Sequence, residues 1–259
     1  MAIDPKTLRK AQLIMLEMLV EFDTICQKHN LKYWLDSGTL LGAVRHQGFI
    51  PWDDDIDLSM PVEDYRKFKD IANDELSENI FFQTRETDNE FKFDYIKLRS
   101  NKASIVEFHE KDKKINYHQG VFVDIFPMLT IPNTEFYQAF YTDTFKLIRD
   151  VSAISLHTPK GKDLPKIRAT LVDTLNVMHE GWDKKNTKVI YSGKMPDVAA
   201  WFDEDEIFPL SKISFEGLEF YAPKNSHHYL SEIYSFDYTE LPPEDKRTIH
   251  ADSIHFTVE

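Results

Sequence analysis

The feature that most constrains this fold is the run Asp53-Asp54-Asp55-Ile56-Asp57-Leu58, in which carboxylates alternate with apolar residues. In an extended strand, successive side chains point to opposite faces, so Asp55 and Asp57 share one face while the apolar residues between and after them enter the core. Asp53 falls on the same face, one pleat earlier. The run therefore predicts a half-buried strand with a row of carboxylates along one face.

Such a row suits a divalent cation. Mg²⁺ or Mn²⁺ prefers a few carboxylate oxygens together with substrate phosphate oxygens and water. The alternative is a solvated acidic loop, which is what most isolated Asp-x-Asp matches are. Four acids within five positions repel one another, and apolar residues such as Trp52 and Met60 flank them. These two features favour a metal site over the loop.

A turn of small residues, Ser37-Gly38, precedes the acidic run. A short strand over 32–35 is expected to lead into it, and a helix over 39–45 to follow it. A strand that turns at small residues into a helix leaves backbone N–H groups able to bind an anion, and Ser37 can add its hydroxyl. The alternative is an ordinary helix cap with a flexible turn. Its position before the acidic run favours phosphate binding.

Asp124 is a third carboxylate of interest, because it interrupts the apolar run Val121-Phe122-Val123-Asp124-Ile125-Phe126. A buried charge is costly unless something pairs with it, and a shared metal would satisfy it. An aspartate at a strand end that caps the next turn explains the pattern equally well. The residues alone leave these two interpretations open.

Cationic groups are expected around a transferring phosphate, although a surface Lys or Arg is usually only solvated. Lys97 and Arg99 are the best placed, since they alternate with Tyr95 on one expected strand face. Trp52 adjoins the acids but is of a type more often found in a core than stacked on a base. The other candidates that could contact substrate are Arg45, His46, Lys246, Arg247 and His250.

Composition sets the class of protein. The 259 residues, 42% hydrophobic and 13% aromatic, are sufficient for one core. A net charge of −13 argues against a nucleic-acid partner, which needs Lys and Arg to neutralise phosphates. The lone Cys26 cannot form an internal disulfide, and no stretch approaches the roughly 18 apolar residues of a membrane span. We expect a cytoplasmic protein without a transmembrane segment, and peripheral membrane association stays open.

The periodicity predicts a mixed α and β chain. A helix should begin at Asp4-Pro5 and end near Asn30. Further helices are expected at 61–76 and 226–234, and a helical region from 134 to about 179. Strands are expected at 32–35, 55–60, 80–83, 94–98, 104–108 and 121–126, the last ended by Pro127, with a hairpin of 212–215 and 218–221 around Glu216-Gly217.

Several segments together resemble the LicD family, which includes bacterial phosphorylcholine transferases and is related to fukutin and fukutin-related protein. The central block comprises the segments 33–46 and 48–57. The resemblance continues through Asp64-Tyr65, Lys97-Leu98-Arg99, Gly120 to Pro127, Phe215-Glu216-Gly217 and Pro242-Pro243. The stretch Tyr234-Ser235-Phe236-Asp237 departs from the Tyr-Gly-Asp often found there, and 134–205 shows no motif that aligns.

This resemblance implies an α+β fold with a nucleotidyltransferase-like mixed sheet flanked by helices. One catalytic domain would span 1–259, with a core at 1–130, a helical subdomain at 131–205 and a mixed segment at 206–259 that completes the site. It implies that Asp55 and Asp57 hold the metal and that Asp124 supplies the third carboxylate. It further implies transfer of phosphocholine, or another phospho-alcohol, from CDP-choline or another CDP-alcohol to a hydroxyl of a surface glycan such as teichoic acid, lipopolysaccharide or capsule.

The expected chemistry is an in-line displacement that releases CMP, with Asp53 or one of the metal-binding aspartates accepting the hydroxyl proton. Ser37 and Gly38 would hold a phosphate, and Lys97, Arg99 or Arg45 would stabilise its charge. Two alternatives remain at this point. One is a nucleotidyltransferase that leaves a nucleoside monophosphate on its product, and the other is a non-catalytic binding protein that has kept the fold.

Overall fold

The computed structural model describes residues 3–91, 93–157, 170–171, 174, 187–191, 201–234 and 237–257. It opens with the helix α1 (Pro5–Lys28), where the Asp4 carboxylate accepts a hydrogen bond from the Thr7 amide and Pro5 occupies the first helical position. The apolar residues at helical spacing are buried against the strands β4 and β5. The cap and the start of the helix are as the sequence predicts.

A mixed sheet forms the centre of the molecule, in the order β1-β2-β5-β4-β10, with β3 paired to β4, and β6 and β7 continuing from β5. Strands β2 and β5 are parallel, and the other pairs are antiparallel. The strands are β1 (Trp34–Leu35), β2 (Asp57–Pro61), β3 (Ile80–Gln83), β4 (Ile96–Glu107), β5 (Gly120–Pro132), β6 (Thr187–Tyr191), β7 (Phe202–Asp203) and β10 (Ala251–Phe256).

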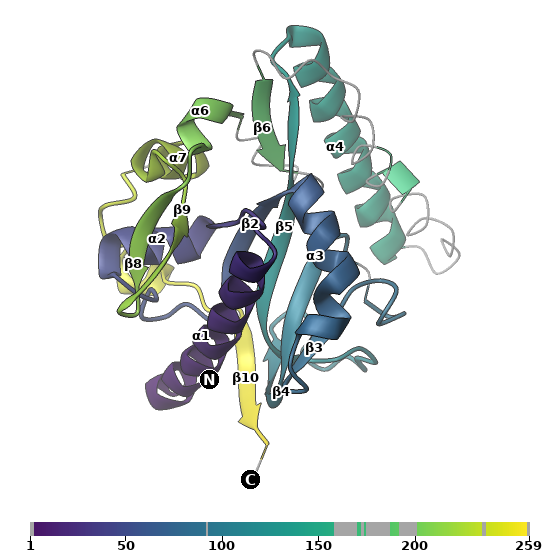
Figure 1. Cartoon of the computed structure of the whole chain (residues 1–259). Coiled ribbons are helices and arrows are strands. Elements are labelled where there is room, and N and C mark those ends of the chain that lie inside the picture. The colour runs from purple at the N-terminus through teal and green to yellow at the C-terminus, as the bar shows by residue number, and fades with distance from the viewer. Residues whose placement is uncertain are drawn as a thin grey trace.

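Helices cover the sheet. Both α1 and α3 (Val62–Glu75) pack on it, α1 against β4 and β5 and α3 against β2 and β5 (Figure 1). Their buried side chains join those of the strands in one hydrophobic core. Helix α2 (Ser37–His46) contacts β2. It also contacts the hairpin of β8 (Ser211–Phe215) and β9 (Leu218–Ala222) and the helix α7 (Ser226–Ile233).

Three strand predictions need correction. The strand expected at 55–60 is β2, which begins at Asp57, so Asp53 and Asp55 lie in the irregular segment before it and not along a strand face. The strands expected at 94–98 and 104–108 are parts of the single strand β4, whose pairing with β5 is irregular between Arg99 and Ser104. Pro127 does not end β5, which continues to Pro132. Pro127 lies after the segment of β5 that pairs with β4 and before the segment that pairs with β6, so its missing N–H interrupts neither antiparallel ladder.

The later part of the chain mixes helix and strand. The stretch 131–205, expected to be a helical subdomain, contains α4 (Glu135–His157) and also supplies β6 and β7 to the sheet. Much of the helical pattern expected between 158 and 179 lies outside the described residues. The short helices α6 (Glu204–Ile207) and η2 (Glu244–Lys246) follow, and β10 was not predicted.

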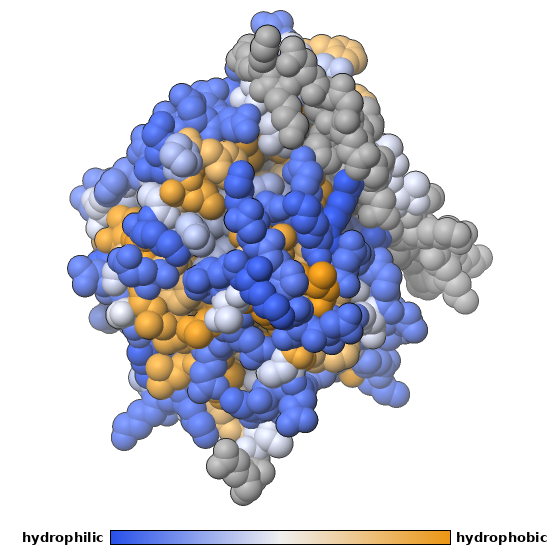
Figure 2. Space-filling model, viewed as in Figure 1, coloured by the Kyte–Doolittle hydropathy of each residue, from blue (hydrophilic) through white to orange (hydrophobic). Residues whose placement is uncertain are grey.

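The architecture is the α+β arrangement that the sequence analysis predicts, a mixed sheet flanked by helices. On the face viewed in Figure 2, hydrophilic side chains are interspersed with hydrophobic ones. Within the described ranges, each helix is too short or too polar to cross a bilayer.

Candidate active site

Sheet register brings three functional side chains together at the centre of the sheet. Asp57 on β2 is the direct partner of Asp124 on β5 in the parallel pair. On the other side of β5, Asp124 is the direct partner of Lys97 on β4. Directly opposed residues on neighbouring strands have side chains on the same face, about 5 Å apart. Asp57 and Asp124 are therefore neighbours in the fold, although 67 positions separate them in the chain.

Lys97 and Asp124 form a buried ion pair. The Lys97 Nζ lies 2.8 Å from Oδ1 and 2.9 Å from Oδ2 of Asp124, and both side chains are less than a tenth exposed. The same ammonium lies 3.3 Å from the centre of the Phe122 ring. Burial lowers the pKa of Lys97, and the neighbouring Asp124 opposes that effect. The strand-end interpretation of Asp124 is wrong, because Asp124 lies within β5, beside a cation.

The acidic run places several carboxylates close to this pair. Burial, and then the charges of Asp57 and Asp54, raise the pKa of the half-buried Asp53 to about 7. Burial and the charges of Asp57, Asp53, Asp54 and Asp124 raise the pKa of Asp55 well above its usual range. Each raised pKa means that the fold stabilises the protonated carboxyl group relative to the charged carboxylate. The site therefore has an excess of negative charge that protons, or a cation, would relieve.

The donor set fits a hard divalent cation. Asp55, Asp57 and Asp124 offer only carboxylate oxygens, which are the ligands that Mg²⁺ and Mn²⁺ favour, and mutual repulsion among them is what a bound cation would remove. Each carboxylate has about four acceptor positions, so Asp124 could keep its contacts with Lys97 and still contact a cation.

The raised pKa values predict how stability depends on pH without divalent cation. Between 3.8, the ordinary pKa of the Asp53 carboxyl, and about 7, its value in the fold, the folded protein holds a proton that the unfolded chain has released. The contribution of Asp53 to stability must therefore fall as pH rises through this window. In EDTA, we expect the thermal midpoint to be a few degrees lower at pH 8 than at pH 5.5. Calorimetry of Asp53→Asn should show a shallower decrease, and equal slopes would contradict the assignment.

The Ser37-Gly38 turn lies directly beside the acids. A Cβ placed on Gly38 would be 2.9 Å from Oδ2 of Asp53, so any larger residue would push on that carboxylate. Ser37 has a left-handed backbone, φ 45°, which is uncommon for serine and typical of functional turns. Its amide donates to the Asp36 side chain at 2.6 Å, so this N–H is already used, and the anion-binding hypothesis rests on the Ser37 hydroxyl and the Gly38 amide.

Asp36 is a buried carboxylate that the sequence analysis did not single out. It caps α2 and accepts hydrogen bonds from the hydroxyls of Ser59 and Tyr229, the latter at 3.0 Å. The Tyr229 ring stacks on Phe202, with centroids 4.1 Å apart. The Ser37 turn is thus tied to β2 and to α7 through one side chain. The Asp-Ser-Gly sequence before a helix was the available signal, since aspartate is a preferred cap.

Tyr234 was also missed as a site residue. It follows α7, and burial together with the charges of Asp57, Asp53 and Asp36 raises the pKa of its phenol above the usual range. The Tyr234 hydroxyl is therefore close enough to the acidic run to be influenced by its charges. Position 234 is the tyrosine that this chain keeps where the Tyr-Gly-Asp pattern is expected, which was the signal that could have identified it.

The remaining basic candidates have defined places. Arg99 is buried, and it donates to Oε1 of Gln83 and to the carbonyl of Gly120, both at 2.8 Å, which joins β3, β4 and β5. Arg45 donates to the carbonyls of Tyr238 and Glu240, at 3.0 and 3.1 Å. These contacts make both arginines supports of the framework around the site.

The C-terminal segment crosses the acidic run. The buried Asp54 carboxylate accepts hydrogen bonds from the amides of His250 and Ala251, and His250 Nδ1 lies 3.3 Å from it. The charge of Asp54 raises the pKa of His250, mainly through their hydrogen bond. The guanidinium of Arg247 lies 4.4 Å from the Trp52 ring centre.

These contacts distinguish Asp54 from the other acids of the run. Asp54 is buried and anchors the start of β10, whereas Asp53, Asp55 and Asp57 are half-buried. Trp52 also meets His46 edge to face, with ring centroids 6.4 Å apart. Lys246 lies exposed in η2, one residue from Arg247.

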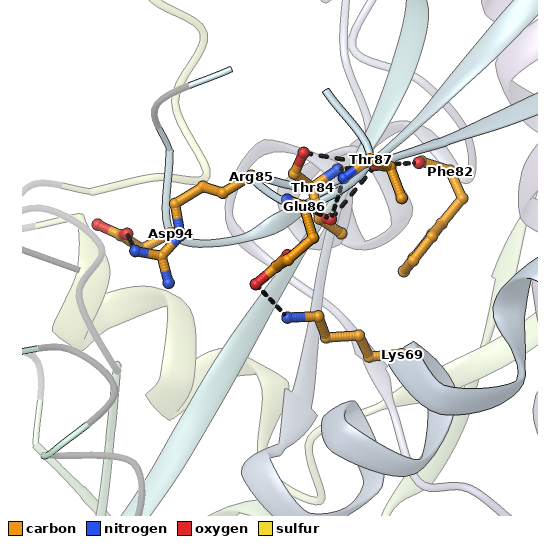
Figure 3. Close-up of polar contacts among 7 residues, drawn as sticks. All are labelled: Lys69, Phe82, Thr84, Arg85, Glu86, Thr87 and Asp94. Atoms are coloured by element: carbon orange, nitrogen blue, oxygen red, sulfur yellow. Dashed lines mark hydrogen bonds and ion pairs between the residues drawn. The ribbon is translucent and has the colours of Figure 1, made fainter. Parts of the chain in front are cut away.

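A polar turn supports the beginning of β4 (Figure 3). Arg85 lies 3.0 Å from the buried side chain of Asp94, two residues before β4. The hydroxyls and amides of Thr84 and Thr87 close the turn after β3, and Glu86 reaches Lys69 on α3 at 3.0 Å. The turn fixes the point at which the chain enters β4, which carries Lys97.

Comparison with known proteins identifies similar sequences. Residues 30–151 match the family model described as the LicD/FKTN/FKRP nucleotidyltransferase domain. The lipopolysaccharide cholinephosphotransferase LicD of Haemophilus influenzae is 27% identical over 94% of this chain and 96% of its own length. The human ribitol 5-phosphate transferase FKRP is 48% identical over 40 residues, which are 15% of this chain and 8% of that protein. An uncharacterised Rickettsia typhi protein is 47% identical over 24% of this chain and 20% of its own.

Proposed function

We propose that this chain is a LicD-family, divalent-cation-dependent transferase that moves phosphocholine from CDP-choline to a hydroxyl of a cell-surface glycan and releases CMP; the match of residues 30–151 to the family model and the similarity to the Haemophilus protein support this. Both similarities support an enzyme that transfers phosphate-containing groups. The choice of phosphocholine follows from the similarity to the Haemophilus protein, which extends over nearly the whole chain. Lipopolysaccharide is the first acceptor to test for the same reason.

One observation carries the proposal: Asp57 and Asp124 oppose each other on parallel strands, within a group of carboxylates that raise one another's pKa. A divalent cation held by Asp55, Asp57 and Asp124 would neutralise charge on the donor diphosphate. The other steps are assigned to the chain itself. Ser37 and Gly38 bind a donor phosphate, and Lys97 holds Asp124 in place and adds positive charge beside it.

The acceptor hydroxyl attacks the phosphorus of the phosphocholine group, the bond from that phosphorus to the CMP oxygen breaks, and CMP leaves. The hydroxyl proton goes to a carboxylate. We assign it to Asp53, since this side chain lies against Gly38, between the phosphate-binding turn and the rest of the acidic run. In-line attack requires that donor and acceptor be held in a fixed relative orientation, which a rigid sheet and turn can provide.

The test measures CMP release from CDP-choline by the full chain, with Mn²⁺ or Mg²⁺, in the presence of lipopolysaccharide or teichoic acid. We expect release that needs both cation and acceptor, and a product heavier by phosphocholine. CDP-ribitol and CDP-ethanolamine serve as alternative donors, CDP-ribitol being suggested by the local similarity to a ribitol 5-phosphate transferase. A product that carries a nucleoside monophosphate would replace the proposal with nucleotidyl transfer, and failure to bind either cation by calorimetry would favour a binding protein.

A further inference from the structure

The tip of the β8–β9 hairpin carries a glutamate in an unusual backbone conformation. Glu216 has φ 54° and Gly217 has φ 77°, so both central residues of this turn are left-handed. Tight hairpins with this geometry favour Asn, Asp or Gly at both positions. A glutamate there adopts an unfavourable conformation, which points to a task for its side chain.

The Glu216 side chain reaches across to the loop that precedes the acidic run. Its Oε1 accepts a hydrogen bond from the Phe49 amide at 3.0 Å, and its own amide donates to the Gln47 carbonyl at 2.9 Å. Arg9 of α1 donates hydrogen bonds to the same carboxylate from both terminal nitrogens, Nη1 at 3.0 Å and Nη2 at 2.6 Å. The side chain of Glu216 is 16% exposed, so these bonds are partly shielded from water.

The loop is built to allow this approach. A Cβ on Gly48 would overlap Oε1 of Glu216, so any larger residue at position 48 would displace this carboxylate. A Cβ on Gly42 would lie 2.5 Å from the Gly48 carbonyl oxygen, so the loop also packs tightly on α2. The Phe49 ring contacts that of Phe215, the residue before Glu216, with centroids 4.9 Å apart.

Arg9 extends the contact to the acidic run itself. Its Nη1 lies 3.2 Å from Oε1 of Gln12, one turn along α1. Gln12 is buried and donates from Nε2 to the Asp53 carbonyl at 2.9 Å. A continuous series of hydrogen bonds therefore runs from Glu216 through Arg9 and Gln12 to the backbone of Asp53.

We propose that Glu216 is a positioning residue that holds segment 47–53 and thereby fixes where Asp53 and the carboxylates after it stand; this inference rests on the proposed function. The carboxylates of the acidic run repel one another, and that repulsion favours movement of the segment away from the sheet. Glu216 and Gln12 oppose the movement by pinning the backbone at Phe49 and at Asp53. The Arg9–Glu216 pair is partly exposed, with Arg9 46% accessible, so its loss should cost little global stability.

The test compares Glu216→Ala, Glu216→Gln and a matched control. Glu17→Ala is the control, because Glu17 lies on α1, as Arg9 does, and forms an exposed ion pair with Lys102 at 2.8 Å, away from the loop. Amide hydrogen exchange is measured on the full chain. We expect Glu216→Ala to speed exchange in peptides covering 47–55, while exchange elsewhere and the thermal midpoint match those of Glu17→Ala. Glu216→Gln keeps an acceptor for the Phe49 amide and should restore much of the protection.

Turnover supplies the second measurement. Glu216→Ala should lower kcat by about ten- to a hundredfold with little change in KM for the donor, because the reacting groups are misplaced and donor binding is retained. Glu216→Gln should lie between it and wild type. Unchanged exchange at 47–55 in both Glu216 variants would overturn the inference. If wild type turns over none of the CDP-alcohols, the proposed function fails, and the exchange data still decide the role of Glu216.

Discussion

Replacing Asp57 by asparagine is expected to reduce turnover by about 10³-fold or more and, in the absence of divalent cation, to stabilise the protein. Asparagine has the size of aspartate and no charge. Asp57 contributes to the raised pKa of Asp53 and of Asp55, so its charge is unfavourable to two neighbouring carboxylates in the fold. A substitution that destroys activity while raising stability would show that the folded protein tolerates repulsion there for a functional reason.

The expected gain in the free energy of unfolding is about 1 kcal/mol, which corresponds to a rise in thermal midpoint of about 2–4 °C for a chain of this size. Calorimetry in EDTA measures it. Asp70→Asn is the matched control, because Asp70 is an exposed aspartate on α3 and should give almost no change. Adding Mn²⁺ should stabilise wild type more than Asp57→Asn. A destabilised Asp57→Asn protein, or full turnover by it, would contradict the role given to this carboxylate.

The elements governed by local sequence could be predicted. Asp4-Pro5 determines the start of α1, and the glycine of Glu216-Gly217 between two strand-like segments predicts the tight hairpin. The strand β3 has the predicted bounds. In each case, the signal lies within a few residues: a cap, a fixed φ, or an alternation between core and solvent. The acidic run follows this rule only in part, since alternation predicts the strand from Asp57 onward but Asp53 and Asp55 lie before it.

The relations that assemble the site were not accessible, because they depend on register between distant strands. Nothing near Asp124 indicates that Lys97 will lie opposite it, and the sequence could not separate a metal ligand from a strand-end cap. The strand β10 was missed because its anchor, the Asp54 carboxylate, lies about 200 positions earlier. Asp36 was passed over because its importance comes from Ser59 and Tyr229, which only the fold brings to it.

Replacing Lys97 by methionine is expected to cause the largest loss of stability among these variants. Methionine preserves the apolar stem and removes the ammonium that contacts both oxygens of Asp124. Breaking a buried ion pair by removing one partner costs about 3–5 kcal/mol, because the other charge remains in a poorly solvated place. The thermal midpoint should fall by about 10 °C, and turnover should be lost. Urea unfolding and calorimetry of the cation-free protein measure the change.

A double variant separates the effect of the unpaired Asp124 charge from the effect of the altered side chain at position 97. In Lys97→Met/Asp124→Asn, both charges are absent, so most of the lost stability should return, whereas turnover should stay absent because Asp124 no longer offers a carboxylate. Mn²⁺ gives an independent check: a cation bound at Asp124 would replace the missing ammonium, so it should raise the midpoint of Lys97→Met more than that of the double variant. Equal effects of Mn²⁺ on the two proteins would show that Asp124 does not bind the cation. A Lys97→Met protein as stable as wild type would show that the ion pair does not hold this carboxylate in place.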